Sequence, residues 1–203
     1  TQGYSSAASD VYKRQSKDIA RRKLIPTDIL EAHDSGAIHF HDMDYIIQPM
    51  FNCCLINLED MLTNGTVING KKIDTPKSFQ VACTVTTQII AQVASGQYGG
   101  QSINGIDRIL APFVRKSYEK ILNNVIEEQV EIYGMEPNME KAREIAWKRT
   151  RKEVKDGIQT IQYQINTLMT TNGQSPFVTL FLNLEEDDPY LSLIHISEPT
   201  RRS

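Results

Sequence analysis

The helical periodicity between Asn138 and Leu168 constrains the fold of this chain more than any other feature of its sequence. Seven residues in this stretch alternate spacings of four and three, in the series Trp147, Arg151, Val154, Ile158, Ile161, Ile165 and Leu168. This spacing places side chains on one face of an α-helix, and only Arg151 interrupts the apolar stripe. Asn138 is a residue type that helix N-caps favour. The sequence therefore predicts a long amphipathic helix with one buried face.

Two further helices are predicted upstream of this one. Asp74 and Thr75 precede Pro76, an order typical of a capped helix start with proline in the first turn, so a helix is expected over 76–95. The next helix ends near Gly134 and has one apolar face, formed by Ile106, Leu110, Phe113, Ile121 and Val125. Between them, the four glycines of "GQYGGQSING" predict a loop that approaches a ligand or a neighbouring backbone closely.

Short apolar segments flank these helices and have the character of strands. The run "MFNCCLINL" is predicted to form a strand buried on both faces, within a stretch that is extended from Ile38 to about Leu58. A turn at Asn172 and Gly173 leads into the β-rich run "SPFVTLFLNL", and two Asn-Gly pairs in "TNGTVINGKK" are typical of a hairpin. Extended segments around long helices predict an α/β protein.

The charge balance and the cysteines exclude several classes of function. A net charge of -3 over 203 residues gives no basic field for phosphate backbones, so nucleic acid is not expected as a direct ligand. No apolar run approaches the length of a membrane helix, and the N-terminus lacks a secretory signal. The cysteines are expected to be free thiols in a reducing compartment, since there are only Cys53, Cys54 and Cys83. We therefore expect a cytoplasmic protein that does not bind membranes.

The two ends of the chain have a different character from its middle. The segments "SSAASDVYKRQ" and "LSLIHISEPTRRS" resemble translated sequencing-adapter read-through. We therefore expect residues 1–15 and 191–203 to be non-native scars, and the natural protein to extend beyond both ends. The native part, 16–190, is expected to open with a charged helical lead-in over 16–36 that breaks at Pro26.

The segment at 38–58 concentrates side chains that can do chemistry. Five of them are possible metal ligands, namely His39, His41, Asp42, Cys53 and Cys54. No metal site is predicted, because the spacing differs from that of zinc ligand pairs, and a disulfide between adjacent cysteines would form a strained ring. Two interpretations stay open. The cysteines are small buried residues of an apolar strand, or the strand lines a cavity, as polar Asn52 and Asn57 suggest.

Several blocks of the sequence, taken in order, resemble the catalytic subunit of the anaerobic (class III) ribonucleoside-triphosphate reductases, a glycyl-radical enzyme family. They are "IHFHDMDY", "PMFNCCLINLEDML", "PKSFQVACTVTTQIIAQVASGQYGGQSINGIDRILAPFV" and "TTNGQSPFVT". The resemblance covers roughly residues 20–185. It implies a ten-stranded α/β barrel, built from two antiparallel-joined halves, with the active site inside. Residues 16–190 would form the N-terminal part of that barrel domain.

The resemblance implies a radical route from ribonucleoside triphosphates to 2'-deoxyribonucleotides for DNA synthesis. A glycyl radical generates a thiyl radical on a second cysteine, which removes the 3'-hydrogen. The 2'-hydroxyl then leaves as water, and Cys53, which matches the family's active-site cysteine on this strand, supplies a proton and a reducing hydrogen. Cys54 falls where the family does not require cysteine. Formate is the implied reductant, and a radical-SAM iron-sulfur enzyme is the implied activating partner.

Other parts of the family's machinery lie outside this sequence. These are the radical glycine, the thiyl cysteine, the zinc-binding cysteines and the ATP-binding regulatory region, so this piece is expected to be inactive alone. The candidates for substrate contact within it are His39, His41, Asn52 and Asn172. The alternative is that the two histidines cap the strand and satisfy buried backbone groups, and that Asn172 and Gln174 form a turn.

The resemblance also implies a deoxynucleoside triphosphate effector site at a homodimer interface, on Asp74, Lys77, Gln88, Ile89 and Lys120. Lys77 would lie in the first turn of a helix, whose free amides favour phosphate. Gln88 follows eleven residues later, about three turns of helix, and so projects from the same face. Gln88 would read a base edge, Ile89 would pack on the base and Asp74 would accept from the ribose. The alternative is that both lysines are ordinary solvated side chains.

Two rival functions fit parts of the pattern. A pyruvate formate-lyase-like acyltransferase of the same barrel type uses two adjacent cysteines, as Cys53 and Cys54 are. The blocks that follow Pro76 fit the reductase better. The second rival is a non-catalytic module whose helices only dimerise.

Overall fold

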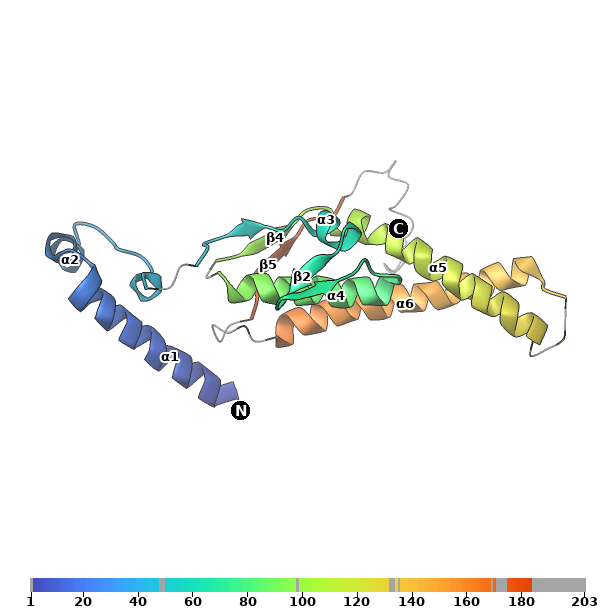
Figure 1. Ribbon diagram of the computed structural model, residues 1–203, viewed down its shortest axis with the longest axis horizontal. Coiled ribbons are helices and arrows are strands. Elements are labelled where there is room, and N and C mark those ends of the chain that lie inside the picture. The colour runs from blue at the N-terminus through green and yellow to red at the C-terminus, as the bar shows by residue number, and fades with distance from the viewer. Residues whose placement is uncertain are drawn as a thin grey trace, which may run out of the picture.

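The computed structural model describes the backbone over 2–47, 50–97, 99–131, 134, 136–168, 170 and 175–183, with side chains from residue 10 onward. Figure 1 shows a small β-sheet with long helices packed beneath it, and a separate N-terminal arm of helices. The described chain is mixed α/β and mostly helical, which confirms the predicted fold class at that level.

The N-terminal arm forms a small hydrophobic cluster of its own. It consists of α1 (Gln2–Ile19), the π-helix η1 (Ala20–Leu24), α2 (Thr27–Asp34) and the 3-10 turn η2 (Met43–Tyr45). Ala20, Ile25 and Met43 are buried together, and the predicted break at Pro26 is confirmed. The expectation of an extended chain from Ile38 onward is wrong. Asp42 adopts a φ of 54° and the chain turns into η2, which brings Met43 back onto α1.

Three short parallel strands form the sheet, in the order β1 (Cys54–Leu55), β4 (Gln101–Ile103) and β5 (Val178–Leu180). The segment 50–58 is not a strand buried on both faces, because the side chains of Phe51 and Leu55 are 77% and 70% exposed. Asn57 also ends the extended stretch early: its side-chain oxygen accepts from Asp60 N at 3.4 Å and begins helix α3 (Leu58–Thr63).

The predicted hairpin is confirmed as β2 (Thr66–Ile68) paired antiparallel with β3 (Lys71–Ile73). Asn69 and Gly70 both have positive φ, as a two-residue hairpin turn of this twist requires. The hairpin lies beside α4 in Figure 1. It therefore covers part of that helix and is not part of the parallel sheet.

The long helices are α4 (Phe79–Ser95), α5 (Ile106–Glu131) and α6 (Met139–Thr167). The predicted cap of α6 is confirmed, since Asn138 Oδ1 accepts from Lys141 N at 3.0 Å. The predicted start of the first long helix is wrong. That helix begins at Phe79, three residues after Pro76, and its cap is Ser78 rather than Asp74 or Thr75. Pro76 is buried just before the helix.

The buried face of α6 coincides with the predicted apolar stripe only in part, at Val154 and Ile161. Arg151 and Ile158 are exposed, and Trp147 is only partly buried. The buried positions are mostly small side chains, namely Ala142, Ala146, Thr150, Val154, Gly157 and Ile161. Small residues let neighbouring helices approach closely, so these positions are covered although they lack large apolar side chains.

The three long helices pack in a defined register. Gln80 Nε2 lies 3.3 Å from Thr160 Oγ1, and Thr87 further along α4 meets Gln164 further along α6, so these two helices run parallel. Arg149 makes a bidentate ion pair with Glu128 at 2.9 and 3.0 Å, which anchors α5 to the start of α6. The helices are thus held together by polar contacts at their rims as well as by the core.

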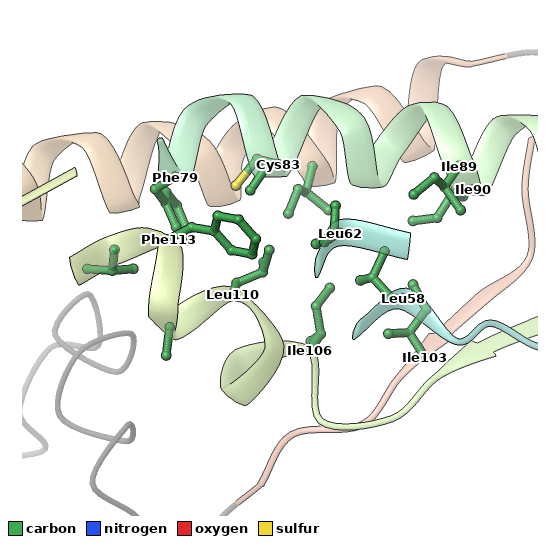
Figure 2. Close-up of a cluster of buried hydrophobic side chains, with 14 of the residues drawn as sticks. Leu58, Leu62, Phe79, Cys83, Ile89, Ile90, Ile103, Ile106, Leu110 and Phe113 are labelled. Carbon is green, nitrogen blue, oxygen red and sulfur yellow. The ribbon is translucent and has the colours of Figure 1, made fainter. Parts of the chain in front are cut away.

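The core lies between the helices and the sheet. Figure 2 shows Phe79 and Cys83 of α4 directed toward Leu110 and Phe113 of α5, with side chains of α3 and β4 alongside. Burial raises the pKa of the Cys83 thiol to about 12. Cys83 is therefore a protonated core residue at neutral pH and not a reagent.

No helix in the described part of the chain is both long and apolar enough to cross a membrane. Residues 2–15 belong to α1, whereas 191–203 lie outside the described residues. The assignment of both ends as non-native scars stays a prediction.

Candidate active site

Cys53 lies immediately before β1, with an exposed side chain. Its Sγ is 3.4 Å from Oδ1 of Asn52, which is also exposed, so the thiol and a carboxamide stand together at the edge of the sheet. The structure thus brings together two of the predicted site residues. It also separates the two cysteines, because Cys54 is half-buried and Cys53 is not.

The loop before β4 reaches the strand that carries Cys53. Phe51 pairs with Gln97 through an isolated parallel bridge, and Cys54 pairs with Gln101 in β4. A Cβ at Gly99 would lie 2.1 Å from Asn52 O and 2.7 Å from Cys53 Sγ. Only glycine fits this contact, which confirms the expectation that the glycine-rich loop approaches a neighbouring backbone closely.

Gln97 contacts both sides of this junction. Its Oε1 accepts from Cys54 Sγ at 3.0 Å and its Nε2 donates to Gly99 O at 3.1 Å. The side chain is buried, at 4% exposure. Burial also raises the pKa of the Cys54 thiol, which keeps it protonated and able to donate. Gln97 was not among the residues singled out from the sequence, because its partner is 43 residues away.

His39 and His41 belong to a histidine cluster in the N-terminal arm. The ring of His39 lies 5.4 Å from that of His33 and 5.7 Å from that of His41, and His41 Nδ1 contacts the Asp42 carboxylate. His33 Nδ1 accepts from Phe40 N at 3.1 Å. Within the described residues, no group of three or more histidine, cysteine or acidic side chains is arranged to hold a metal ion. The histidines thus lie together, and their role in substrate binding stays a prediction.

Asn172 and Gln174 lie outside the described residues, and their roles stay predictions. The strand that follows them is described. Phe177 O accepts from Gln101 N at 2.9 Å, which joins β5 to β4. Asn183 N, just beyond β5, donates to both carboxylate oxygens of Asp107 at 3.1 and 3.0 Å. These bonds tie the segment after residue 174 to β4, the strand next to β1, and to the start of α5.

Four of the five effector candidates have exposed side chains, namely Asp74, Lys77, Gln88 and Lys120. The fifth, Ile89, is 2% exposed and belongs to the core cluster, so this arrangement does not support its predicted contact with a base. The reason is that α4 turns this position toward the core (Figure 2). Lys77 precedes the N-cap Ser78 and therefore lies outside the helix, contrary to the prediction.

The first turn of α4 has its amides satisfied from within the protein. Phe79 N donates to Ser117 Oγ, and Gln80 N donates to Glu153 Oε1. Val81 N and Ala82 N donate to Ser78 Oγ and Ser78 O, respectively. Glu153 therefore already provides a carboxylate at the positive end of the helix dipole. The argument that free helix amides near Lys77 would bind phosphate is wrong, and only the charge of the lysine remains.

Comparison with known proteins gives a consistent result. The model of the family described as anaerobic ribonucleoside-triphosphate reductase matches residues 1–198. The enzyme of that name from Salmonella typhimurium is 48% identical over 170 residues, which is 83% of this chain and 23% of the relative. That from Enterobacteria phage T4 is 42% identical over 166 residues, which is 81% of this chain and 26% of the relative. The chain therefore spans about a quarter of the length of these relatives.

A solved structure shares the fold. The crystal structure of the anaerobic ribonucleotide reductase from Thermotoga maritima, in complex with dATP and CTP, matches with a TM-score of 0.57. The match covers 88% of this chain and 26% of that one, at 16% sequence identity. At that identity the likeness concerns the arrangement of helices and strands, and not particular site residues.

Proposed function

Since the chain belongs to the anaerobic ribonucleoside-triphosphate reductase family, we propose that it is the part of such an enzyme that carries the substrate-side cysteine, Cys53. The full-length enzyme reduces ribonucleoside triphosphates to 2'-deoxyribonucleotides. The observation that carries this proposal is the exposed Cys53 thiol beside the Asn52 carboxamide, on a strand end that Gly99 contacts closely. Family membership favours this function over that of a pyruvate formate-lyase-like acyltransferase.

Each group at the site has a role that its environment supports. Cys53 is exposed, so a ribose can reach its sulfur, and the thiol can deliver its single hydrogen on that face, which formate as the reductant then restores. Asn52 offers an amide donor and acceptor for a sugar hydroxyl at the same strand end. His39 and His41 would contact ribose or phosphate from the N-terminal arm. Asn172 would do so from the segment that precedes β5.

The rest of the machinery belongs to parts of the enzyme beyond this chain. A glycyl radical, formed by a radical-SAM activating enzyme, supplies the radical chemistry there, with formate as the reductant. On this proposal β1, β4 and β5 are strands of the ten-stranded barrel, since they run parallel and carry the cysteine at one end. The family's zinc site and ATP-binding region also belong to the parts outside this chain.

The test of the reductase function uses the full-length enzyme, activated anaerobically. We expect conversion of a ribonucleoside triphosphate to its 2'-deoxy product with formate consumed in equal amount, measured by chromatography. An activated enzyme that carries the glycyl radical and forms no deoxy product would contradict the proposal. Transfer of an acyl group to coenzyme A would instead favour the acyltransferase, and no turnover of any kind would favour the dimerisation module.

We further propose a deoxynucleoside triphosphate effector site on exposed residues around α4, at a homodimer interface. Ser117 of α5 contacts Phe79 at the start of α4, so Lys120, one turn further along α5, lies at the same end of α4 as Lys77. Two cations near one helix end would hold the phosphates. Gln88 lies nine residues into α4, about 14 Å along its axis, where it would meet the base.

Changing the effector residues should weaken nucleotide binding. We expect Lys77→Ala and Gln88→Ala to weaken dATP or dTTP binding by roughly tenfold each, because each removes a charged or paired hydrogen bond worth about 1.5 kcal/mol. Equilibrium dialysis of the full-length enzyme provides the measurement. Lys141→Ala is the matched control, since Lys141 is an exposed lysine at the start of α6. Equal affinity in all the variants would contradict the effector site.

A further inference from the structure

The pairing between β1 and the segment before β4 contains one extra residue, next to Cys53. Phe51 pairs with Gln97 and Cys54 pairs with Gln101. Two residues therefore lie between the pairs on the cysteine side, and three lie between them on the other side. Two backbone hydrogen bonds of 3.2 Å bound the irregular stretch. Phe51 N donates to Gly96 O at one end, and Cys54 N donates to Gly100 O at the other. An extra residue of this kind is a β-bulge, which redirects side chains and occurs often beside active sites.

The bulge places Asn52 and Cys53 between the two closing bonds. Gly99, on the longer side, lies so close to them that even a methyl group would collide with Asn52 O and with Cys53 Sγ. The position of Gly99 therefore limits where the Cys53 thiol can lie. Gly96, Gly99 and Gly100 in this loop have no side chain to hold it, so its backbone needs a further restraint.

The Gln97 side chain provides that restraint. Its carboxamide accepts from the Cys54 thiol and donates to the Gly99 carbonyl, so a single buried group joins the two sides of the bulge. Cys54 is half-buried and packs against the core, whereas Cys53 is exposed. A bond that holds Cys54 therefore also restrains the backbone from which the Cys53 side chain emerges.

We propose that Cys54 and Gln97 are positioning residues, which act with Gly99 to hold the Cys53 thiol in place for catalysis. This inference rests on the proposed function for its effect on turnover, but not for its effect on the geometry of Cys53. Cys54 thereby gains a role as a hydrogen-bond donor, distinct from that of the catalytic cysteine beside it. A serine at this position keeps a donor of similar size, whereas an alanine removes it.

The test compares Cys54→Ala with Cys54→Ser in the full-length enzyme, with two independent readouts. The first is the rate at which iodoacetamide alkylates Cys53, followed by peptide mass spectrometry across a pH series. The second is kcat and KM of the activated enzyme. Cys83→Ala is the control, because it removes a buried cysteine from the core without touching the bulge.

For Cys54→Ala we expect iodoacetamide to alkylate Cys53 about threefold faster. We also expect kcat to fall about tenfold while KM stays within about twofold, because a misplaced reacting group lowers the rate more than it weakens binding. Cys54→Ser should return both readouts to within about twofold of the parent enzyme. Cys83→Ala should leave the alkylation of Cys53 unchanged. Should Cys54→Ala fail to fold, Gln97→Met removes the same bond to Cys54, together with the bond to Gly99 O, and carries the same expectations.

The outcomes separate this inference from the proposed function. Unchanged alkylation of Cys53 in Cys54→Ala, or a serine variant as impaired as the alanine one, overturns the positioning role. Faster alkylation in an enzyme whose parent form makes no deoxy product supports the positioning role and contradicts the proposed function. Unchanged alkylation in an active enzyme contradicts only the positioning role.

Discussion

Replacing Cys53 with serine in the full-length, activated enzyme is expected to lower kcat by about a thousandfold or more, a loss of roughly 4 kcal/mol of transition-state stabilisation. Serine keeps the size of the side chain and a donor for Asn52 Oδ1, so the local hydrogen bond survives. A hydroxyl gives up its hydrogen, whether as a proton or as an atom, far less readily than a thiol does. The measurement is the rate of deoxynucleotide formation under anaerobic conditions, with the glycyl-radical content checked by electron paramagnetic resonance.

The neighbouring residue offers a closely matched control for this experiment. Cys54→Ser makes the same chemical change one residue along the strand, where the thiol donates to Gln97 instead of facing solvent. It should retain activity within about twofold, since a hydroxyl can make the same bond. If Cys53→Ser retains as much activity as an active Cys54→Ser variant, Cys53 is not the catalytic cysteine.

The helix boundaries show which features of the fold can be predicted from the sequence. The start of α6 was predicted correctly because its cap is local, with Asn138 bonding an amide three residues away. The start of α4 was not, although Asp74 and Thr75 look like caps. Side chains from α5 and α6 accept hydrogen bonds from the first amides of α4. These partners lie far away in the sequence, so a local sequence pattern cannot predict them.

The candidate site divides in the same way. Cys53 and Asn52 are adjacent in the sequence, so their contact needs no tertiary information. The glycines at 96–100 predicted a close backbone approach, and Gly99 makes one. The sequence did not predict that Gln97 would bridge the two segments, because a glutamine in a loop is usually solvated. Its burial becomes apparent only once β4 pairs beside β1.

The burial of α6 shows why periodicity alone predicted its covered face only in part. Hydrophobic patterns give weight to large apolar residues such as Ile158, which is 37% exposed. Besides Val154 and Ile161, the covered face carries the small residues Ala146, Thr150 and Gly157. A Cβ at Gly157 would lie 2.6 Å from the Phe79 ring and 3.0 Å from Cys83 Sγ. The core between α4 and α6 therefore depends on the absence of a side chain at this position.

Replacing Gly157 with valine should consequently destabilise the chain by about 3 kcal/mol, because the new side chain must displace Phe79 from a filled core. Helix propensity alone favours valine over glycine by a few tenths of a kcal/mol, so it predicts a small change of the opposite sign. Urea unfolding followed by circular dichroism measures the free energy of unfolding. Gln159→Val is the matched control, since it introduces the same side chain at an exposed position of α6.

The double variant Gly157→Val with Phe79→Ala identifies the source of the loss. Removing the Phe79 ring vacates the space that the valine needs, so the two changes together should cost less than the sum of their separate effects, by about 1 kcal/mol or more. Additive losses would mean that the valine collides with something other than Phe79. If Gly157→Val is as stable as Gln159→Val, α4 and α6 can separate without cost, and their close packing does not hold the core together.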